Sequence, residues 1–329
     1  MRLATQTAVN VGDEQHRDID VTRLEPTFLR EAWAGLEQEQ KALSAKYFYD
    51  ERGSQYFDDI CALGEYYPYR TEMSMLPNVA DELAQMSEDS LTVVEFGAGS
   101  LIKIRPLLRA VPSICTYVPI DVSGEHLYQA TRALRHEFSD VRIKPHVADM
   151  WEPGELPPTK HQLMGFFPGS TIGNFDPVDA VAFLKRVKSY LGSGSQLLIG
   201  VDTKKSPAIL HRAYNDGRGI TAAFNLNMLR RLNNELEADI NLKQFEHYAY
   251  YNAPLGRIEM HLVSTCDQNF SVGGRRFYMH TGESIHTENS YKYSPKQFRH
   301  LAANAGWACQ RQWLADGDMF AMYLLSAER

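Results

Sequence analysis

The chain has 329 residues, of which 44% are hydrophobic and 23% charged, values typical of folded globular proteins rather than disordered or collagen-like chains. Its 34 basic and 41 acidic side chains leave a net charge of −7, which argues against a broad phosphate-binding surface and so against nucleic acid as the main ligand. No apolar run is long enough to span a bilayer, and the N-terminus has no apolar targeting segment. We therefore expect a cytoplasmic protein, not bound to membranes, that acts on a small metabolite.

The first part of the chain is predicted to be a tail followed by helices. Residues 1–24 are polar and show no sustained period, which indicates an N-terminal tail. Residues 25–70 contain two helical stretches, PTFLREAWAGLEQ and QKALSAKYFYD, and we expect this segment to pack with the substrate-binding part of the protein. Pro68 interrupts the tyrosine-rich segment that follows, so the next helix is predicted to begin near Thr71.

The central part predicts a parallel sheet. Five short apolar runs each end at polar or small residues and precede a helix-compatible segment: LTVVEF, TYVPI, RIKPHVA, LMGFF and QLLIGV. Such alternation is typical of a Rossmann-like α/β sheet, whose ligands bind at the carboxyl ends of the strands. We assign residues 71–202 and 291–329 to this domain. Ser294 as N-cap, Pro295 and Gly306 frame a helix, after which ACQRQWLA and FAMYLLSA predict a closing antiparallel strand pair.

Residues 203–290 break the alternation and predict an inserted α+β domain for substrate recognition. A long helical region comes first, followed by the strands RIEMHLVSTC and RRFYMHTG with QNFSVGG as their connection. Neither the four widely spaced cysteines nor the scattered histidines form a metal-ligand pattern, so we expect no metal site and no disulfide.

A cofactor site is indicated where the first strand ends. Gly97 and Gly99 form a glycine turn, and Asp121, at the end of the second strand, is placed to bind ribose hydroxyls. A nicotinamide-binding motif would need glycine at the position of Ile102, whereas Glu95 before two glycines resembles the first motif of class I S-adenosylmethionine methyltransferases. A tight strand-to-helix connection without a ligand is the alternative interpretation.

Two further elements fit an adenosyl ligand. Asp149 and Met150, at the third strand end, could bracket an adenine, with the carboxylate accepting from the exocyclic amine and the thioether lying against the ring. Lys103 is expected to point from the first turn of the following helix toward a ligand carboxylate, although a solvated lysine would look the same in the sequence.

Several motifs together resemble a known family. The segments, in chain order from about Ala45 to the C-terminus, are KYFYDERGSQYFDDI, EYYPYRTE (65–72), VVEFGAGS, PGSTIGNFDP (168–177), AYNDGRGITAAFN (213–225) and HTENSYKYS (286–294). They resemble the ergothioneine-pathway histidine N-alpha-methyltransferases. The resemblance implies a monomer that uses S-adenosylmethionine, releases S-adenosylhomocysteine and converts L-histidine in three steps to its trimethyl derivative, hercynine.

The resemblance also implies roles for individual residues. S-adenosylmethionine would contact Gly97, Gly99, Lys103, Asp121, Asp149 and Met150. Residues that hold the amino-acid end of histidine would be Tyr66, Asn174 and Tyr214. The family's T-E-x-S element, which reads the imidazole, corresponds to Thr287, Glu288, Asn289 and Ser290, and other pocket-lining positions to Tyr49, Phe57 and Met260.

The chemistry of histidine agrees with these roles. Neutral imidazole has one N–H donor and one acceptor nitrogen, so Glu288 and Ser290, two positions apart on one face of a strand, could satisfy both. The α-amino group is mostly protonated at pH 7, so a proton must leave before each transfer, through the Tyr49 hydroxyl or through water. Asn174 can offer both a donor and an acceptor to the zwitterion, or it caps the following helix. Methylation of another small amine, a non-catalytic cofactor-binding module and a nicotinamide oxidoreductase are the alternatives.

Overall fold

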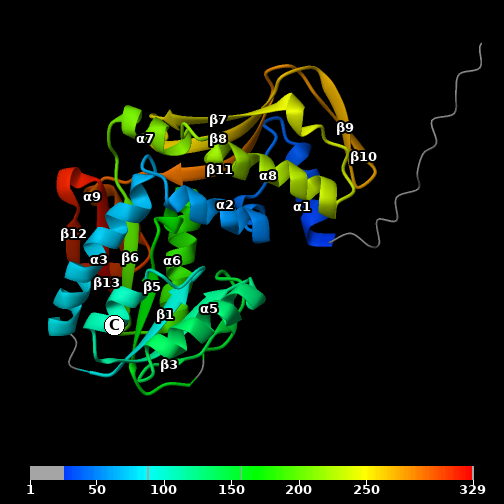
Figure 1. Ribbon diagram of the computed structural model, residues 1–329. Helices are drawn as coiled ribbons and strands as arrows, with labels where there is room; N and C mark the ends of the chain where they lie inside the picture. Colours follow the sequence, from blue (N-terminus) through cyan, green and yellow to red (C-terminus); the bar gives the residue numbers. More distant parts are fainter. Residues whose placement is uncertain (1–25, 87–88, 157, 328–329) are drawn as a thin grey trace, which may run out of the picture.

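The computed structural model describes residues 26–86, 89–156 and 158–327 (Figure 1), so the expected tail, residues 1–24, lies outside the described residues. The N-terminal elements are α1 (Pro26–Leu36), a 3₁₀ turn (Ala45–Phe48), α2 (Glu51–Cys61) and α3 (Tyr67–Met86). The prediction that a helix begins near Thr71 is wrong, because α3 already begins at Tyr67 and carries Pro68 in its first turn. A proline is tolerated there, since the first N–H groups of a helix have no partner within it.

The predicted Rossmann-like sheet is confirmed. Its strand order is β12-β13-β6-β5-β1-β2-β3, with β4 also paired to β2. The five apolar runs form parallel strands, the third of them split by Pro145, and the last two strands add the expected antiparallel pair. The strand bounds are β1 (Leu91–Phe96), β2 (Ile114–Asp121), β3 (Arg142–Ile143), β4 (His146–Val147), β5 (Gln162–Phe167), β6 (Gln196–Asp202), β12 (Trp307–Leu314) and β13 (Phe320–Ala327).

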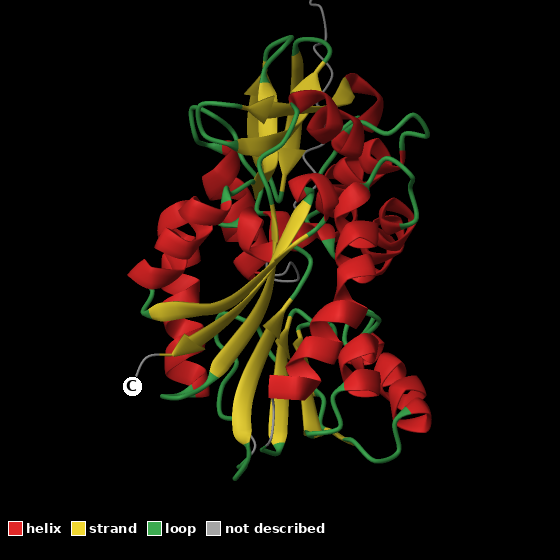
Figure 2. Ribbon diagram, turned by 90° about the vertical axis from the view of Figure 1, so that its left-hand side faces the viewer, coloured by secondary structure: helices red, strands yellow, loops and turns green. Residues whose placement is uncertain are grey.

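Helices cover both faces of this sheet, as Figure 2 shows. One hydrophobic cluster joins the sheet to α3, α4 (Arg105–Ala110) and α5 (Gly124–Glu137), and another joins it to α6 (Pro177–Leu191) and α9 (Pro295–Asn304). Helix α9 begins as expected, with Ser294 and Gln297 forming a capping box. None of the described helices combines the length and apolar character that crossing a bilayer requires.

The segment after β6 builds a separate antiparallel half. Helices α7 (Pro207–Tyr214) and α8 (Ile220–Glu235) precede a three-stranded sheet of order β11-β8-β7 and a hairpin of β9 and β10. The prediction of QNFSVGG as a connection is wrong: Gln268–Val272 is strand β9, and only Gly273 and Gly274 form the turn, both with positive φ as a tight hairpin turn requires. The other strands are β7 (Phe245–Asn252), which the sequence analysis did not predict, β8 (Arg257–Ser264), β10 (Arg275–Met279) and β11 (Ser284–Tyr291).

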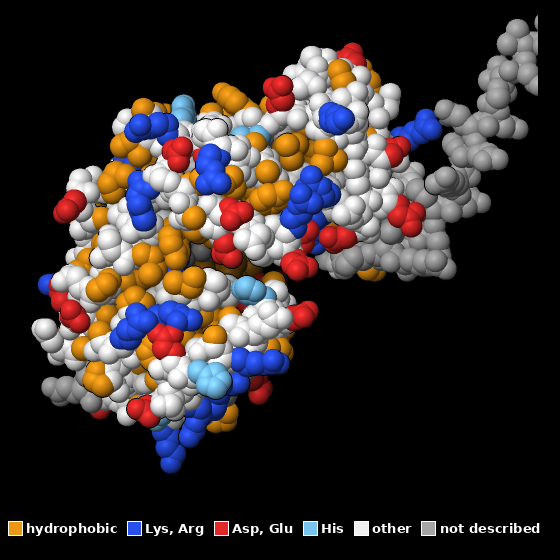
Figure 3. All heavy atoms as spheres, viewed as in Figure 1, with side chains coloured by type: hydrophobic (Ala, Val, Ile, Leu, Met, Phe, Trp, Pro, Cys, Tyr) orange, Lys and Arg blue, Asp and Glu red, His pale blue; other side chains and the backbone are white. Residues whose placement is uncertain are grey.

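The N-terminal helices share a core with this antiparallel half. Phe28 of α1 and Ile60 of α2 belong to the same buried hydrophobic cluster as Leu229 of α8 and Leu262 of β8. The two halves of the molecule meet where the backbone of Thr203 bridges that of Tyr293. Figure 3 shows a hollow between them, edged by hydrophobic side chains.

Candidate active site

The glycine turn after β1 is braced by the end of β2. Gly97 and Gly99 have φ of +67° and +54°, which glycine adopts without strain. The Gly99 N–H donates to Asp121 at 2.9 Å, and a Cβ added to Gly97 would lie 3.7 Å from the sulfur of Met150. The structure thus brings the ends of β1, β2 and β4 together, with Gly97, Gly99, Asp121 and Met150 around one site at the carboxyl edge of the sheet. Asp149 lies beside them and accepts from the N–H of Trp151 at 2.9 Å.

Lys103 lies differently from the expectation. Helix α4 begins only at Arg105, so Lys103 precedes it, and its ammonium group pairs with the fully buried carboxylate of Glu72 at 2.8 Å. Burial would lower the pKa of Lys103, but Glu72 outweighs burial and raises that pKa. Glu72 also accepts from the N–H of Gly169 at 2.8 Å, so a single carboxylate of α3 fixes both the lysine and the loop after β5.

Gly200 makes room for this carboxylate. A Cβ at position 200 would lie 2.0 Å from Oε1 of Glu72, an impossible approach. We expect Gly200→Ala to lower the free energy of unfolding by at least about 2 kcal/mol, because Glu72 is buried and cannot move to water. Urea denaturation would measure the loss. Gly217→Ala is the matched control, because its Cβ would meet no atom within 4 Å, and an equal loss in both variants would contradict the explanation.

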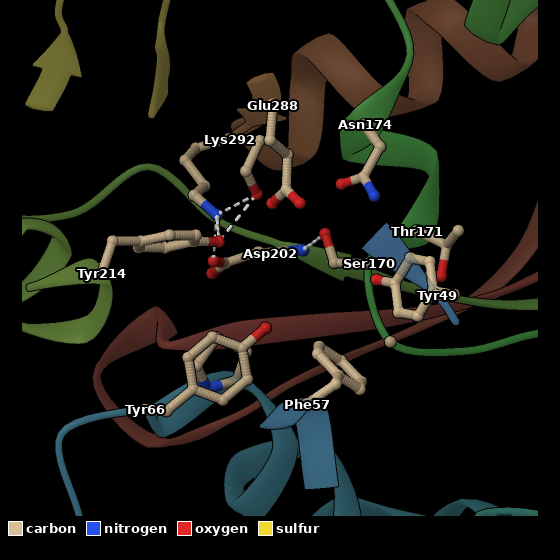
Figure 4. A pocket seen from close by; sticks show the side chains of 13 residues that line it. Tyr49, Phe57, Tyr66, Ser170, Thr171, Asn174, Asp202, Tyr214, Glu288 and Lys292 are labelled. Carbon is tan, nitrogen blue, oxygen red and sulfur yellow. Dashed lines mark hydrogen bonds and ion pairs between the residues drawn. The ribbon is translucent and has the colours of Figure 1, made fainter. Parts of the chain in front are cut away.

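A pocket lies between the two halves, lined by residues that follow β5, by the last residue of β6 and by residues in or beside the N-terminal helices, α7 and β11. Figure 4 shows its side chains. The pocket is partly open to solvent. Seven residues singled out in the sequence line it: Tyr49, Phe57, Tyr66, Asn174, Tyr214, Glu288 and Ser290. The sequence analysis assigned no role to others that line it, namely Pro68, Gly169, Ser170, Thr171, Asp202 and Lys292.

A β-bulge at Thr287 determines which side chains of β11 face the pocket. The pairing of β11 with β8 passes from His286–His261 directly to Glu288–Met260, so Thr287 is the extra residue. Side chains alternate along a strand, so in a regular strand without a bulge His286 and Glu288, two residues apart, would share a face. The bulge therefore turns Glu288 and Ser290 inward while His286 faces the opposite side.

Three residues of the expected recognition set do not line the pocket. The Thr287 hydroxyl is buried and donates to Asn225 of α8 at 2.7 Å and to the carbonyl of Met260 at 3.1 Å, so it holds the bulge. Asn289 points to the other face, with its Nδ2 3.4 Å from Asp176. Met260 pairs with Glu288 across β8 and β11, but it is 1% exposed and belongs to the hydrophobic core.

Aromatic rings form one wall of the pocket. Tyr49 and Phe57 meet edge to face at 5.7 Å between ring centroids, and Tyr66 and Tyr214 do so at 6.0 Å. Although the Tyr49 ring is 40% exposed, its hydroxyl points toward the pocket in Figure 4. Burial raises the pKa of the Tyr49, Tyr66 and Tyr214 hydroxyls, so all three keep their protons at neutral pH.

A network of buried charges forms part of the pocket wall. Asp202, at the end of β6, is fully buried and contacts the ammonium groups of Lys205 at 2.5 Å and Lys292 at 2.8 Å, and it accepts from the Tyr67 hydroxyl at 2.6 Å. Burial would raise the pKa of Asp202, but the two lysines outweigh it and lower that pKa. Lys292 is 2% exposed and also donates to Tyr214 at 3.0 Å and Ser290 at 2.7 Å.

The carboxylate of Glu288 is available to a ligand. No described residue donates a hydrogen bond to it, and burial raises its pKa to about 7, against the opposing charge of Lys292. The amide of Asn174 likewise has no hydrogen-bond partner within the described segments and points toward the pocket in Figure 4. Glu288 and Asn174 therefore give the pocket two polar groups that a bound molecule can satisfy.

One group of possible metal ligands lies outside this pocket. Ligand atoms of Glu259, His261 and His286 come within 4.8 Å of one another, on the opposite face of the β8–β11 pair. Glu259 already accepts from Tyr250 and Arg257, both at 2.7 Å, and its pKa is about 2. The two imidazole rings stack at 4.9 Å and 23°, so their in-plane lone pairs do not converge on one point. This arrangement is a hydrogen-bonded stack rather than a metal cage.

Comparison with known proteins places the geometry in context. Residues 28–327 match the protein family described as "Histidine-specific methyltransferase, SAM-dependent". The chain is 37% identical over 301 residues to the histidine N-alpha-methyltransferase of Mycobacterium tuberculosis, covering 90% of this chain and 93% of that one. It is 38% identical to the enzyme of the same name from Mycolicibacterium smegmatis, with the same coverage. A 4-dimethylallyltryptophan N-methyltransferase of Trichophyton verrucosum is 27% identical, over 96% of this chain and 98% of that one.

Proposed function

The chain belongs to the histidine-specific, S-adenosylmethionine-dependent methyltransferase family, and from that premise we propose that it methylates the α-amino group of L-histidine. The product would be N-alpha-trimethylhistidine, hercynine, as in ergothioneine biosynthesis. The observation that carries the proposal is the half-buried Glu288 carboxylate, which lines the pocket beside Ser290 and receives no hydrogen bond from any described residue.

Glu288 and Ser290 suit an imidazole. An ionised carboxylate accepts from the ring N–H, and a hydroxyl donates to the other ring nitrogen. A phenyl or indole ring would leave at least one of these groups unpaired, and an unsatisfied polar group costs about 1 to 3 kcal/mol. The pair therefore favours histidine over other aromatic amino acids.

The cofactor would lie at the glycine turn. Gly97 and Gly99 expose backbone without side chains, a Cβ on Gly99 would meet no atom within 4 Å, and Asp121 would bind the ribose. Asp149 and Met150 would hold the adenine. S-adenosylmethionine supplies a methyl group on a sulfonium, which is already a good leaving group. The protein then has to desolvate the amine and orient its nitrogen toward the methyl group. The pocket extends to the carboxyl edge of the sheet, where the cofactor would lie, through Gly169 and Thr171.

The side chains around the amine would orient it and help to transfer its proton. Asn174 offers a carbonyl oxygen that can orient an N–H of the amine. Tyr49 keeps its own proton because its pKa is raised, so it can act as a relay to water but not as a phenolate base. As methyl groups accumulate, the amine becomes a permanent cation, and the ring faces of Tyr49, Phe57 and Tyr66 could stabilise it.

Mass spectrometry tests the proposal directly. The protein is incubated with S-adenosylmethionine and each of the twenty amino acids in turn, and products with one, two or three added methyl groups are scored. We expect trimethylated histidine and no other product. Methylation of a different amine would favour the alternative that this member of the family has another substrate, as the tryptophan-derivative enzyme among its relatives does by name. Cofactor binding without any product would favour a non-catalytic module.

A further inference from the structure

A buried lysine of the pocket wall, Lys292, donates hydrogen bonds to Tyr214 and Ser290. We infer that Lys292, with Tyr214, fills both acceptor positions of the Ser290 hydroxyl, so that Ser290 can only donate into the pocket. Lys292 is thus a positioning residue that selects a neutral ring with one donor and one acceptor. This inference rests on the proposed histidine substrate and names the form of it that the site accepts.

The ammonium group of Lys292 has no hydrogen left for a ligand. It has three N–H donors, and the structure gives it three acceptors: Asp202 at 2.8 Å, Tyr214 at 3.0 Å and Ser290 at 2.7 Å. Although Lys292 borders the pocket, it acts there only through these partners (Figure 4).

Ser290 is left with a single free function. Its oxygen accepts from Lys292 at 2.7 Å and from the Tyr214 hydroxyl at 2.8 Å. A hydroxyl oxygen has two lone pairs and one hydrogen, so both lone pairs are used and only the hydrogen remains. The Tyr214 hydroxyl cannot readily reverse its bond, because a phenol is a better donor than an alcohol and an ammonium group already donates to it.

Asp202 keeps the arrangement fixed. Burial alone would lower the pKa of Lys292, but the adjacent Asp202 carboxylate outweighs burial and raises it, so the lysine stays charged and cannot accept. The ammonium group of Lys292, buried against Asp202 at the end of β6, therefore donates in the same direction throughout the physiological pH range.

The site therefore combines an acceptor with a donor. Ionised Glu288 only accepts, and Ser290 only donates. A neutral imidazole satisfies both in one of its two tautomers. An imidazolium carries two N–H donors, and the second of them would face the Ser290 hydrogen, so protonated histidine is disfavoured despite the carboxylate.

Double-mutant cycles on histidine affinity test this inference. Calorimetry with the full chain, saturated with S-adenosylhomocysteine, would measure the histidine Kd of wild type, Ser290→Ala, Lys292→Met and the double variant. We expect each single change to raise the histidine Kd about 10-fold. The Kd of the double variant should also be about 10-fold above wild type, because Lys292 acts through Ser290 and the two effects are then not additive. Affinity for S-adenosylhomocysteine should stay within about twofold. Lys296→Met, which removes an exposed lysine of α9, is the charge-matched control.

A second cycle keeps the test valid if Lys292→Met does not fold. Tyr214→Phe removes the other donor to Ser290 and leaves Asp202 and Lys292 paired, and its effect should also be non-additive with Ser290→Ala. Additive losses in the cycles, about 100-fold in the double variants, would overturn the inference while the proposed function stands. Wild type that does not bind histidine would overturn both.

Discussion

Glu288→Gln is expected to lower kcat/KM for histidine about 100-fold and to leave S-adenosylhomocysteine binding unchanged. The amide keeps the size of the side chain but replaces a charged acceptor by a neutral one. If its NH₂ group faces the ring N–H, two donors meet and no hydrogen bond forms. Hydrogen bonds to charged groups contribute about 1.5 to 3 kcal/mol, which sets the expected scale. Steady-state kinetics and cofactor calorimetry measure the two quantities. A 100-fold loss of cofactor affinity would instead mean that the change disturbs the whole cleft.

The pH dependence provides an internal check on Glu288. Its pKa is about 7, so histidine affinity should fall as the pH drops through 7 and the carboxylate takes up a proton. The pKa of Glu288 in the folded state lies above its ordinary value of 4.5, so ionisation of this carboxyl lowers the free energy of unfolding. This loss of stability develops as the pH rises from about 4.5 to about 7. Glu288→Gln lacks this cost and should therefore be at least as stable as wild type at pH 8, which separates loss of recognition from loss of folding.

Asn289→Ala is the neighbouring control. The family resemblance includes Asn289 in the recognition element, whereas the structure turns it away from the pocket toward Asp176. We expect histidine kinetics within about threefold of wild type. A loss as large as that of Glu288→Gln would contradict the strand register described here.

Asp202→Asn is expected to cause the largest loss of stability, about 3 to 5 kcal/mol at pH 7. The change leaves the ammonium groups of Lys205 and Lys292 buried without their counter-charge. Burial lowers the pKa of Lys205 to about 8 even in wild type, where Asp202 opposes the shift. In the variant the pKa of Lys205 should fall further and that of Lys292 should lose the increase that Asp202 causes. The deficit is therefore full at neutral and acidic pH and shrinks as rising pH lets the lysines lose their protons. Urea denaturation at pH 7 and pH 9.5 measures both features.

Asp176→Asn is the matched control for that experiment. Asp176 also pairs with a cation, Arg257 at 3.1 Å, but its side chain is 55% exposed. Exposed ion pairs contribute at most about 1 kcal/mol, so the expected loss is small and nearly independent of pH in the same range. Equal losses at positions 176 and 202 would show that burial is not the cause.

The fold could be predicted because its signals are local. Each parallel strand is a short apolar run that stops at a polar residue, and the sheet order follows from the alternation with helices. The errors have local causes too. The sequence predicts a connection over QNFSVGG because its final Gly273–Gly274 turn hides the strand Gln268–Val272 before it. Pro68 predicts an interruption, whereas the helix begins one residue earlier and carries this proline in its first turn.

The candidate site was only partly predictable, because its geometry depends on register. Glu288 and Ser290 reach the pocket through a bulge at Thr287, which depends on a hydrogen bond to Asn225, 62 residues away in the chain. Lys292 continues the alternation of positions 288 and 290, and Asp202 follows a predicted strand, so both carried a signal. What the sequence could not show is that these two meet at 2.8 Å, since they are distant in the chain and look like ordinary surface charges.

The place of β13 in the sheet has a consequence for synthesis of the protein. This strand, Phe320–Ala327, follows the other described strands of the sheet in the chain, yet it lies between β12 and β6 and pairs its first residue with Asp202. While the chain is being made, β6 must therefore remain an unpaired edge, which is the kind of surface that promotes aggregation. Chains that stop a few residues short would leave β6 and the buried charges beside it uncovered. The strand that completes the sheet last thus covers the same strand end that supports the pocket.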